Sequence, residues 1–333
     1  MENDSRIKEQ LAEKYFEEGE TAFEDNDYEK AIDCYKRAVT CKPDYADAYY
    51  WMGYTYWVWN RQYEKAIECF QKAIELDPDY ADAYSWMGEA YYEWNGQYEK
   101  AIECYKKAIE YEPDDADAYY RMGHVYADWN GQYEKAIECY KEAIKLKPDF
   151  VFTYWGMGSA YEAWNGQYEK AIECYKEAIK LKSQDLIFYN LMAIAYENWN
   201  GQYEKAIECY QKAIELKPDY AGAYYDMGNA YAKWNGQYEK AIECFEKAIE
   251  LKPDYASAYK GMGVAYEAWN GQYEKAIECY KKAIELNPDF AAAYCNMGGT
   301  YLAIGNREQA KTYFKQAAEL GNEDAKEWIK RMS

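Results

Sequence analysis

The sequence predicts an all-α solenoid of nine antiparallel helix hairpins that ends in a capping helix. Three observations lead to this prediction. The phrase GQYEKAIECY recurs almost unchanged along the 333 residues, all seven prolines fall at one phase of the repeat, and apolar residues recur at helical spacing. A strict period of this length is typical of a stacked array, in which each repeat buries its apolar face against its neighbours.

The first helix of a repeat is predicted from its apolar spacing, as the repeat at 44–78 shows. Tyr49, Met52, Gly53 and Tyr56 lie at i, i+3, i+4 and i+7 and therefore share one helical face. A turn follows, reading Trp-Asn-Arg here and Trp-Asn-Gly in the next six repeats. Asn or Gly at this point can adopt the left-handed conformation that ends a helix.

The second helix and the next turn complete the repeat. A second apolar face is made by Tyr63, Ala66, Ile67, Phe70 and Ala73. Pro78 then begins the next turn, and Asp79 is expected to cap the following helix. The tail at 323–333 is expected to be a capping helix, with Trp328 and Ile329 covering the last hairpin.

The repeats are expected to form one domain over residues 1–333. Ser183 stands where the period calls for a proline. The predicted repeats lie at approximately 8–43, 44–78, 79–113, 114–148, 149–183, 184–218, 219–253, 254–288 and 289–322.

Charge and cysteine usage limit the possible partners and the compartment. The net charge is −21, which disfavours nucleic acid and anionic membranes, because both are bound mainly through Lys and Arg. Eight of the ten cysteines recur at one point of the repeat, a spacing too wide for disulfides between stacked helices. We expect them to be small buried residues, in a chain with no signal peptide that resides in the cytoplasm.

The repeat resembles the tetratricopeptide repeat (TPR). That family's pattern of an aromatic, a Leu-Gly pair, Tyr, Ala, an aromatic, Ala and Pro is matched here by Tyr49, Met52-Gly53, Tyr56, Ala66, Phe70, Ala73 and Pro78. The resemblance implies a right-handed superhelix whose first helices line a concave, partner-binding surface. Seven repeats are one residue longer than is usual in the family. A 35-residue period is also typical of the RNA-binding pentatricopeptide family, but that extra residue lies elsewhere and those proteins are basic.

Comparison of the repeats with one another identifies candidate binding residues. The second helices are nearly identical, whereas the first helices differ at the positions that line the groove in the resembled family. The candidates for a peptide-binding groove are Asp47, Tyr50, Tyr54, Trp57, Asp82, Ser85, Glu89, Tyr92, Asp117, Tyr120, His124, Asp128, Phe152, Trp155, Ser159, Glu162, Asn190, Tyr225 and Asn229. Tyr50, Tyr54 and Trp57 either form an open patch or pack against a terminal element or a second copy.

The pattern favours a non-catalytic protein-interaction scaffold. The groove positions are acidic and aromatic, so we expect a protein or peptide ligand that carries basic and apolar residues. The alternatives are a self-associating structural solenoid, an engineered consensus-like array without an evolved ligand, and an RNA binder. His124 is the sole histidine, and phosphate-binding loops, metal-ligand spacings and nucleophile motifs are absent from the sequence. We therefore expect no enzyme activity, no cofactor and no metal. The seven turn tryptophans are interpreted as structural wedges.

Overall fold

The turn inside six of the hairpins is built by an Asn-Gly-Gln sequence, which reads Asn60-Arg61-Gln62 in the second hairpin. The computed structural model describes residues 2–182 and 184–332, with side chains from residue 5 onward. Asn95 and Gly96 both have positive φ, 58° and 61°, which confirms the predicted left-handed turn. The Gln97 amide Nε2 donates to the Trp94 carbonyl oxygen at 3.1 Å, and Lys100 Nζ donates to Gln97 Oε1 at 2.9 Å. The same two hydrogen bonds recur in other repeats, so the sequence of the turn, rather than its surroundings, sets its shape.

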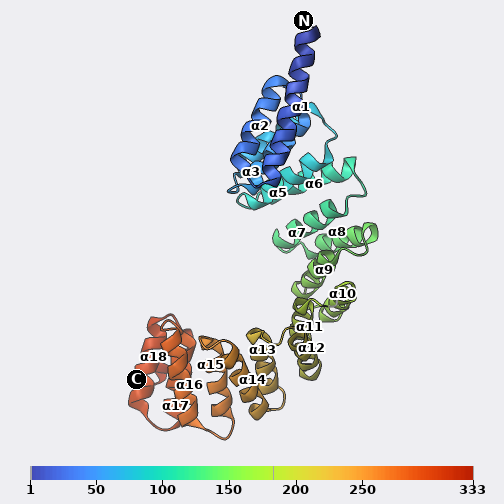
Figure 1. The fold of residues 1–333 in the computed structure, drawn as a ribbon. Helices are drawn as coiled ribbons and strands as arrows, with labels where there is room; N and C mark the ends of the chain where they lie inside the picture. Colours follow the sequence, from blue (N-terminus) through green and yellow to red (C-terminus); the bar gives the residue numbers. More distant parts are fainter. Residues whose placement is uncertain (1, 183, 333) are drawn as a thin grey trace. The chain divides into compact units, whose positions relative to one another are not determined.

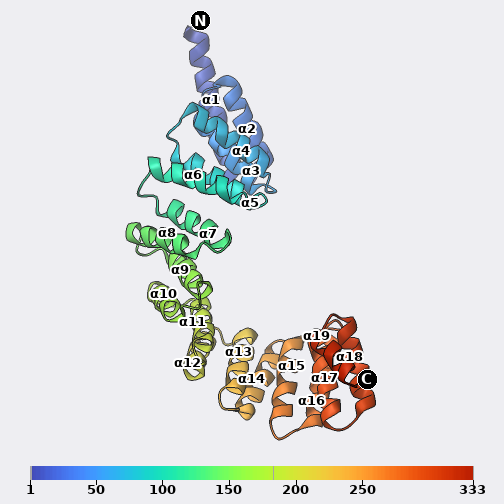
Figure 2. The same ribbon diagram turned by 180° about the vertical axis from the view of Figure 1, so that it is seen from behind.

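All regular structure in the described residues is α-helical, and the chain divides into two units, Met1–Asn165 and Gly166–Ser333. Figures 1 and 2 show the helices of each unit following one another as antiparallel pairs. The N-terminal unit contains α1 (Glu2–Glu24), α2 (Tyr28–Cys41), α3 (Ala46–Val58), α4 (Tyr63–Leu76), α5 (Ala81–Glu93), α6 (Tyr98–Tyr111), α7 (Ala116–Asp128), α8 (Tyr133–Leu146) and α9 (Val151–Ala163).

The C-terminal unit repeats the arrangement and adds a final helix. It contains α10 (Tyr168–Leu181), α11 (Leu186–Asn198), α12 (Tyr203–Leu216), α13 (Ala221–Lys233), α14 (Tyr238–Leu251), α15 (Ala256–Ala268), α16 (Tyr273–Leu286), α17 (Ala291–Ala303), α18 (Arg307–Glu319) and α19 (Glu323–Met332). Ser183, the position where a proline is due, lies outside the described residues.

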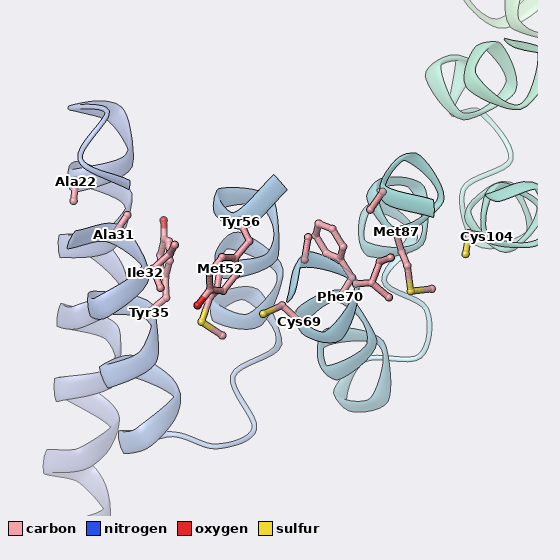
Figure 3. Packing of buried hydrophobic residues seen from close by; sticks show 13 residues of the cluster. Ala22, Ala31, Ile32, Tyr35, Met52, Tyr56, Cys69, Phe70, Met87 and Cys104 are labelled. Atoms are coloured by element: carbon pink, nitrogen blue, oxygen red, sulfur yellow. The ribbon is translucent and has the colours of Figure 1, made fainter. Parts of the chain in front are cut away.

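The core of most hairpins is one aromatic ring held against a glycine, whose place is taken by Ala193 in the α11–α12 hairpin. Phe70 of α4 is fully buried, and a Cβ added to Gly53 of α3 would lie 3.0 Å from its ring. The same added atom would lie 3.1 Å from the Ala66 carbonyl oxygen, so the two helices approach closely because Gly53 and Ala66 are small. Figure 3 shows the corresponding core side chains, from Tyr35 to Met87, following one another through the first hairpins.

The repeated cysteines and tryptophans are structural, as predicted. Each cysteine at the repeated position, from Cys34 to Cys279, is buried. The seven turn tryptophans are half-buried. Trp129 stacks on Tyr98 at the start of the preceding hairpin's second helix, with ring centroids 6.4 Å apart. The ring therefore fills space between successive hairpins.

The predicted helix caps need one correction. Asp79 does not cap α5; the capping position is Tyr80, which makes no side-chain cap hydrogen bond. The ring at this position packs instead, since Tyr80 stacks on Tyr50 of the preceding hairpin and its hydroxyl donates to Asp47 at 2.9 Å. At the start of α5, the Tyr80 ring therefore packs on the preceding hairpin, and no polar side chain caps the helix.

Helix α19 covers the end of the last hairpin, as predicted for the tail. Trp328 stacks on Phe314 of α18 with ring centroids 5.8 Å apart, and Ile329 packs on the same buried cluster. The backbone N–H of Ala325 donates a hydrogen bond to Asn322 Oδ1 at 2.8 Å, and this bond caps the N-terminus of α19. The apolar face that the last repeat would offer to a further repeat is thereby covered.

Candidate functional site

The first helices of successive hairpins lie beside one another and form one face of the N-terminal unit. Helix α3 contacts α5, α5 contacts α7, and α7 contacts α9. In the C-terminal unit the same holds for α13, α15 and α17. Residues on the first helices are therefore presented together, although they are about 35 positions apart in the sequence. This face carries the candidate binding residues.

Three recesses adjoin one another along α5, α7 and α9, and together they are called the α5–α9 groove. The acidic recess, of about 490 Å³, is lined by Asp82, Ser85, Trp86, Glu112, Asp114, Asp115, Asp117 and Arg121. The central recess, of about 250 Å³, is lined by Glu89, Tyr92, Glu93, Tyr120, Arg121 and His124. The apolar recess, also of about 250 Å³, is lined by His124, Ala127, Asp128, Tyr133, Tyr140, Trp155, Gly156, Ser159, Ala160 and Ala163. Neighbouring recesses share Arg121 and His124, so they are continuous.

The structure brings ten of the nineteen candidate residues together in this groove. Each of the ten lines at least one recess, and all lie on α5, α7 or α9. They are Asp82, Ser85, Glu89, Tyr92, Asp117, Tyr120, His124, Asp128, Trp155 and Ser159. Of the other two candidates on α9, Phe152 is 57% exposed and Glu162 is half-buried.

The acidic recess opens where two neighbouring hairpins lack a pair of stacked rings. At the equivalent place between α3 and α5, Tyr50 and Tyr80 stack with centroids 5.1 Å apart. Between α7 and α9, Tyr120 and Phe150 are 5.0 Å apart. Between α5 and α7 the two positions hold Ser85 and Asp115 instead. Since both rings are missing, the space they would fill stays open.

A largely buried ion pair lies where the acidic recess meets the central recess. Arg121 Nη1 lies 2.8 Å from Glu89 Oε2, and both side chains are largely buried. The Arg121 guanidinium also lies over the Trp86 ring, 4.7 Å from its centroid. Glu89 accepts a second hydrogen bond from the Tyr105 hydroxyl at 2.7 Å, and burial raises the pKa of Tyr105 well above its usual value. The Glu89 carboxylate is thus held by residues of its own chain.

The central recess is aromatic and surrounds the histidine. His124 lies edge-on to Tyr92, with centroids 5.6 Å apart, and at 6.4 Å from Tyr120. The Tyr92 hydroxyl donates to Asp128 on the next helix. Burial and the Asp128 carboxylate raise the pKa of Tyr92, so the phenol stays protonated. This arrangement fixes ring positions and leaves the edge of the recess polar.

The candidate residues on α3 are packed into the protein. Tyr54 lies 4.6 Å from the Trp86 ring and 5.6 Å from the ring of Phe23 on α1, measured between centroids. Trp57 lies 5.0 Å from Trp86. Of the readings left open for this patch, packing against a terminal element is the one that the structure shows. Asp47 and Tyr50 are engaged with Tyr80 in the same way.

The three candidates in the C-terminal unit lie on α11 and α13. Tyr225 packs on Phe245 and Tyr255, with centroids 5.9 and 5.1 Å away. The Asn190 Oδ1 atom is buried and accepts no hydrogen bond from any described residue. Asn229 is half-buried on α13.

Five residues that line the acidic recess were not predicted from the sequence. Three of them lie in the loop before α7, namely Glu112, Asp114 and Asp115, whereas the candidates were chosen by comparing the first helices alone. Arg121 and Trp86 were not among the candidates. A signal was present: Asp115 stands where every other corresponding repeat except the sixth, which has Asp185, carries Tyr or Phe.

Two further observations concern membranes and metals. No helix in the described part of the chain has the length and apolar character needed to cross a bilayer. Among the described residues there is no group of three or more His, Cys, Asp or Glu side chains placed to hold a metal ion.

Antiparallel helical hairpins that recur along the chain and pack on one another define it as an α-helical repeat protein. Family models agree with this class and specify it. A model described as TPR repeat matches residues 19–57, 62–93, 95–128, 130–163, 165–198, 200–233, 235–268 and 270–305. One described as Tetratricopeptide repeat matches 291–324. The chain belongs to the tetratricopeptide repeat family.

Two solved structures show the same fold, and a third TPR protein is similar over part of this chain. The C-terminal part of a TPR repeat-containing protein from Cytophaga hutchinsonii matches with a TM-score of 0.64 at 20% identity, covering 74% of this chain and 99% of that one. Yeast Tom70 matches with a TM-score of 0.51 at 16% identity, covering 98% and 96%. YrrB, titled a TPR protein with an unusual peptide-binding site, matches with a TM-score of 0.46 at 26% identity, covering 58% and 96%. A comparison with curated proteins finds no match.

Proposed function

We propose that this chain is a non-catalytic scaffold that binds a peptide segment, or such a segment of a partner protein, in the α5–α9 groove. The observation that carries the proposal is the continuity of the three recesses. Repeats of this family generally serve as protein-interaction scaffolds. A groove with carboxylates at one end and exposed rings at the other is complementary to a segment that has both basic and apolar residues.

The charge of the groove supports a basic ligand. Five carboxylates line the acidic recess, and the one cation among its lining residues, Arg121, is already paired with Glu89. Partial desolvation, and then the neighbouring Asp115, raise the pKa of the Asp82 carboxyl. The negative charges in the recess therefore repel one another, and a bound cation would relieve this repulsion.

The apolar end supports a hydrophobic anchor. Trp155 on α9 is 37% exposed although large aromatic side chains are usually buried, and it lines the apolar recess together with Ala160 and Ala163. Aromatic residues at the centre of an interface carry much of its binding energy. A partner's apolar side chain would cover this surface.

Selection of random 12-residue peptides on the whole chain tests the proposal. We expect enriched peptides with net positive charge and one or more apolar residues, and affinity that falls as salt rises. Reversing two groove charges, Asp82→Lys and Asp117→Lys, should weaken these peptides about tenfold. The control variant, Glu99→Lys with Glu103→Lys, makes the same charge change on exposed positions of the second helix α6.

Two results would overturn the proposal. One is selection that enriches no peptide. The other is equal binding of the enriched peptides to the groove variant and to the α6 variant. Sedimentation of the same samples tests the alternative function: a concentration-dependent mass that vanishes when Phe152 and Trp155 are changed to Ser would show a self-associating solenoid.

A further inference from the structure

We infer that the acidic recess is an arginine-specific pocket, which takes the guanidinium of one arginine side chain from the bound segment. The inference rests on the proposed function, because it names the ligand group that the groove recognises. It is carried by the missing ring pair, by the unpartnered Ser85 hydroxyl and by the distribution of charge around the space that remains.

The recess lies where two aromatic rings are missing. Tyr50 and Tyr80 stack at the equivalent place between α3 and α5, and Tyr120 and Phe150 meet at a tilt between α7 and α9, with ring centroids 5.1 and 5.0 Å apart. Between α5 and α7 the two positions hold Ser85 and Asp115, and the Trp86 ring lines a space of about 490 Å³. This space has room for a planar group such as a guanidinium.

The wall of the recess carries a hydroxyl group, that of Ser85, which has no hydrogen-bonding partner in the described chain. Its side chain is 7% exposed, and it lines the recess. Its hydroxyl makes no hydrogen bond with any residue that the structure describes. The hydroxyl is not among the fully enclosed unpaired atoms of the described residues, so it is reached from the open recess and can accept a hydrogen bond from a donor that enters it.

The negative charge of the acidic recess favours a cationic side chain, and the arrangement of its carboxylates favours arginine over lysine. Asp82, Asp114 and Asp117 lie around the rim, on two helices and a loop, so their oxygens approach the space from different directions. A guanidinium offers five donors in one plane and can serve several carboxylates at once, whereas an ammonium is a strongly hydrated point charge. Arg121 of the chain itself gives an example of a guanidinium over the Trp86 ring beside this recess, 4.7 Å from the ring centroid.

The position of the apolar recess then sets the spacing of the ligand. The acidic recess lies at the N-terminal end of α7, near Asp117, and the apolar recess lies past His124 toward α9. The rise along α7 between these residues is roughly 10 Å, and the step to the next helix is roughly 10 Å. The resulting separation of about 14 Å is spanned by about four residues of an extended chain, or about nine residues of a helix.

Photo-cross-linking with synthetic probes tests the inference. Each probe is a fluorescein-labelled Ser/Gly 14-mer with one arginine and one photo-leucine, separated by two, four or nine positions in either order. We expect the highest yield at a separation of four, with cross-links mapped by mass spectrometry to the stretch of α9 around Trp155 and Ala160. Replacing arginine by lysine should lower the yield, and replacing it by the neutral isostere citrulline should lower it about fivefold.

Two variants of the full chain test the shape and the charge of the pocket separately: the first fills the space, and the second removes negative charge while leaving the space open. Ser85→Tyr with Asp115→Tyr restores the ring pair of the neighbouring hairpins, so it should fold at least as stably and lose the arginine dependence. Asp114→Asn with Asp117→Asn leaves the space open and should lower the arginine-dependent yield about fivefold. The α6 variant, Glu99→Gln with Glu103→Gln, should match wild type.

The outcomes distinguish this inference from the proposed function. Cross-links in the groove that do not depend on arginine, or that persist when the ring pair is restored, would overturn the arginine pocket while the peptide groove stands. A maximum at nine positions would overturn the extended register. Saturable binding of Ca²⁺ alone that abolishes the arginine dependence would make the recess a metal site and overturn the inference. Failure of the peptide selection would instead overturn the proposed function.

Discussion

Replacing Asp226 of α13 by Asn is expected to stabilise the chain at neutral pH and not in mild acid. The pKa of Asp226 is raised to about 6, chiefly because it is buried and next because Glu197 is nearby, although Lys233 partly offsets both effects. Lys233 Nζ forms an ion pair with Glu197 Oε2 at 3.0 Å, and Glu197 Oε1 accepts a hydrogen bond from the Tyr210 hydroxyl at 2.8 Å. The ionised Asp226 is thus left without a hydrogen-bonded partner in the described structure.

The sign and size of the effect follow from the pKa. The unfolded chain releases the Asp226 proton near its ordinary pKa of 3.8, whereas the folded chain keeps it until about pH 6. Folding stability therefore falls as pH rises between about 4 and 6, by about 1.4 kcal/mol for each unit of difference. The two units correspond to about 3 kcal/mol, and we expect about 2 kcal/mol because solvent still reaches part of the carboxyl.

Thermal unfolding at several pH values measures the difference directly. At pH 7.5 the Asp226→Asn variant should melt about 4–8 °C above wild type, and at pH 4 the two should coincide. Asp219→Asn, at an exposed position before the same helix, is the control and should change stability by less than about 0.5 kcal/mol at either pH. A carbon NMR titration in which the Asp226 carboxyl ionises near pH 4, or a melting difference that is the same at both pH values, would refute the reasoning.

Four other substitutions have expected outcomes, each read as a shift of the thermal midpoint. Glu89→Gln removes the charge that pairs with Arg121, and should destabilise the N-terminal unit by about 2–3 kcal/mol, since a largely buried guanidinium loses its counter-charge. Arg61 has a left-handed φ of 51°, so Arg61→Gly should stabilise by about 0.5–1 kcal/mol. Gly123→Ala places a Cβ 2.8 Å from a buried ring and should cost about 1–3 kcal/mol, whereas Gly299→Ala, with nothing within 4 Å, should stabilise by about 0.5–1 kcal/mol.

Each of these substitutions has a result that would contradict it. A Glu89→Gln variant as stable as wild type would mean that other carboxylates compensate Arg121. An Arg61→Gly variant that loses stability would give more weight to the 3.5 Å ion pair between Arg61 and Glu93 than to backbone strain. Equal effects of alanine at Gly123 and Gly299 would mean that the ring beside Gly123 moves aside without cost.

Much of the fold could be predicted from one repeat of the sequence. The helical spacing around Gly53, the left-handed Asn-Gly turn and the covering of the last hairpin by Trp328 are local consequences of residue type, and the structure confirms them. They are predictable because backbone conformation and the apolar face of a helix depend on neighbours within a few positions. The capping position could not be assigned in this way, because the ring of Tyr80 packs on a residue of the preceding hairpin.

The candidate site, too, could be predicted from the sequence only in part. Sequence comparison of the first helices identified positions such as Asp82 and Trp155, because variation among otherwise identical repeats marks where stacking does not dictate the residue. It could not show that Tyr54 and Trp57 are packed between hairpins. The openness of a surface depends on which side chains meet across repeats about 35 residues apart. A recess beside Ser85 exists because rings are missing from two hairpins at once, and only the tertiary structure brings those two absences to the same place.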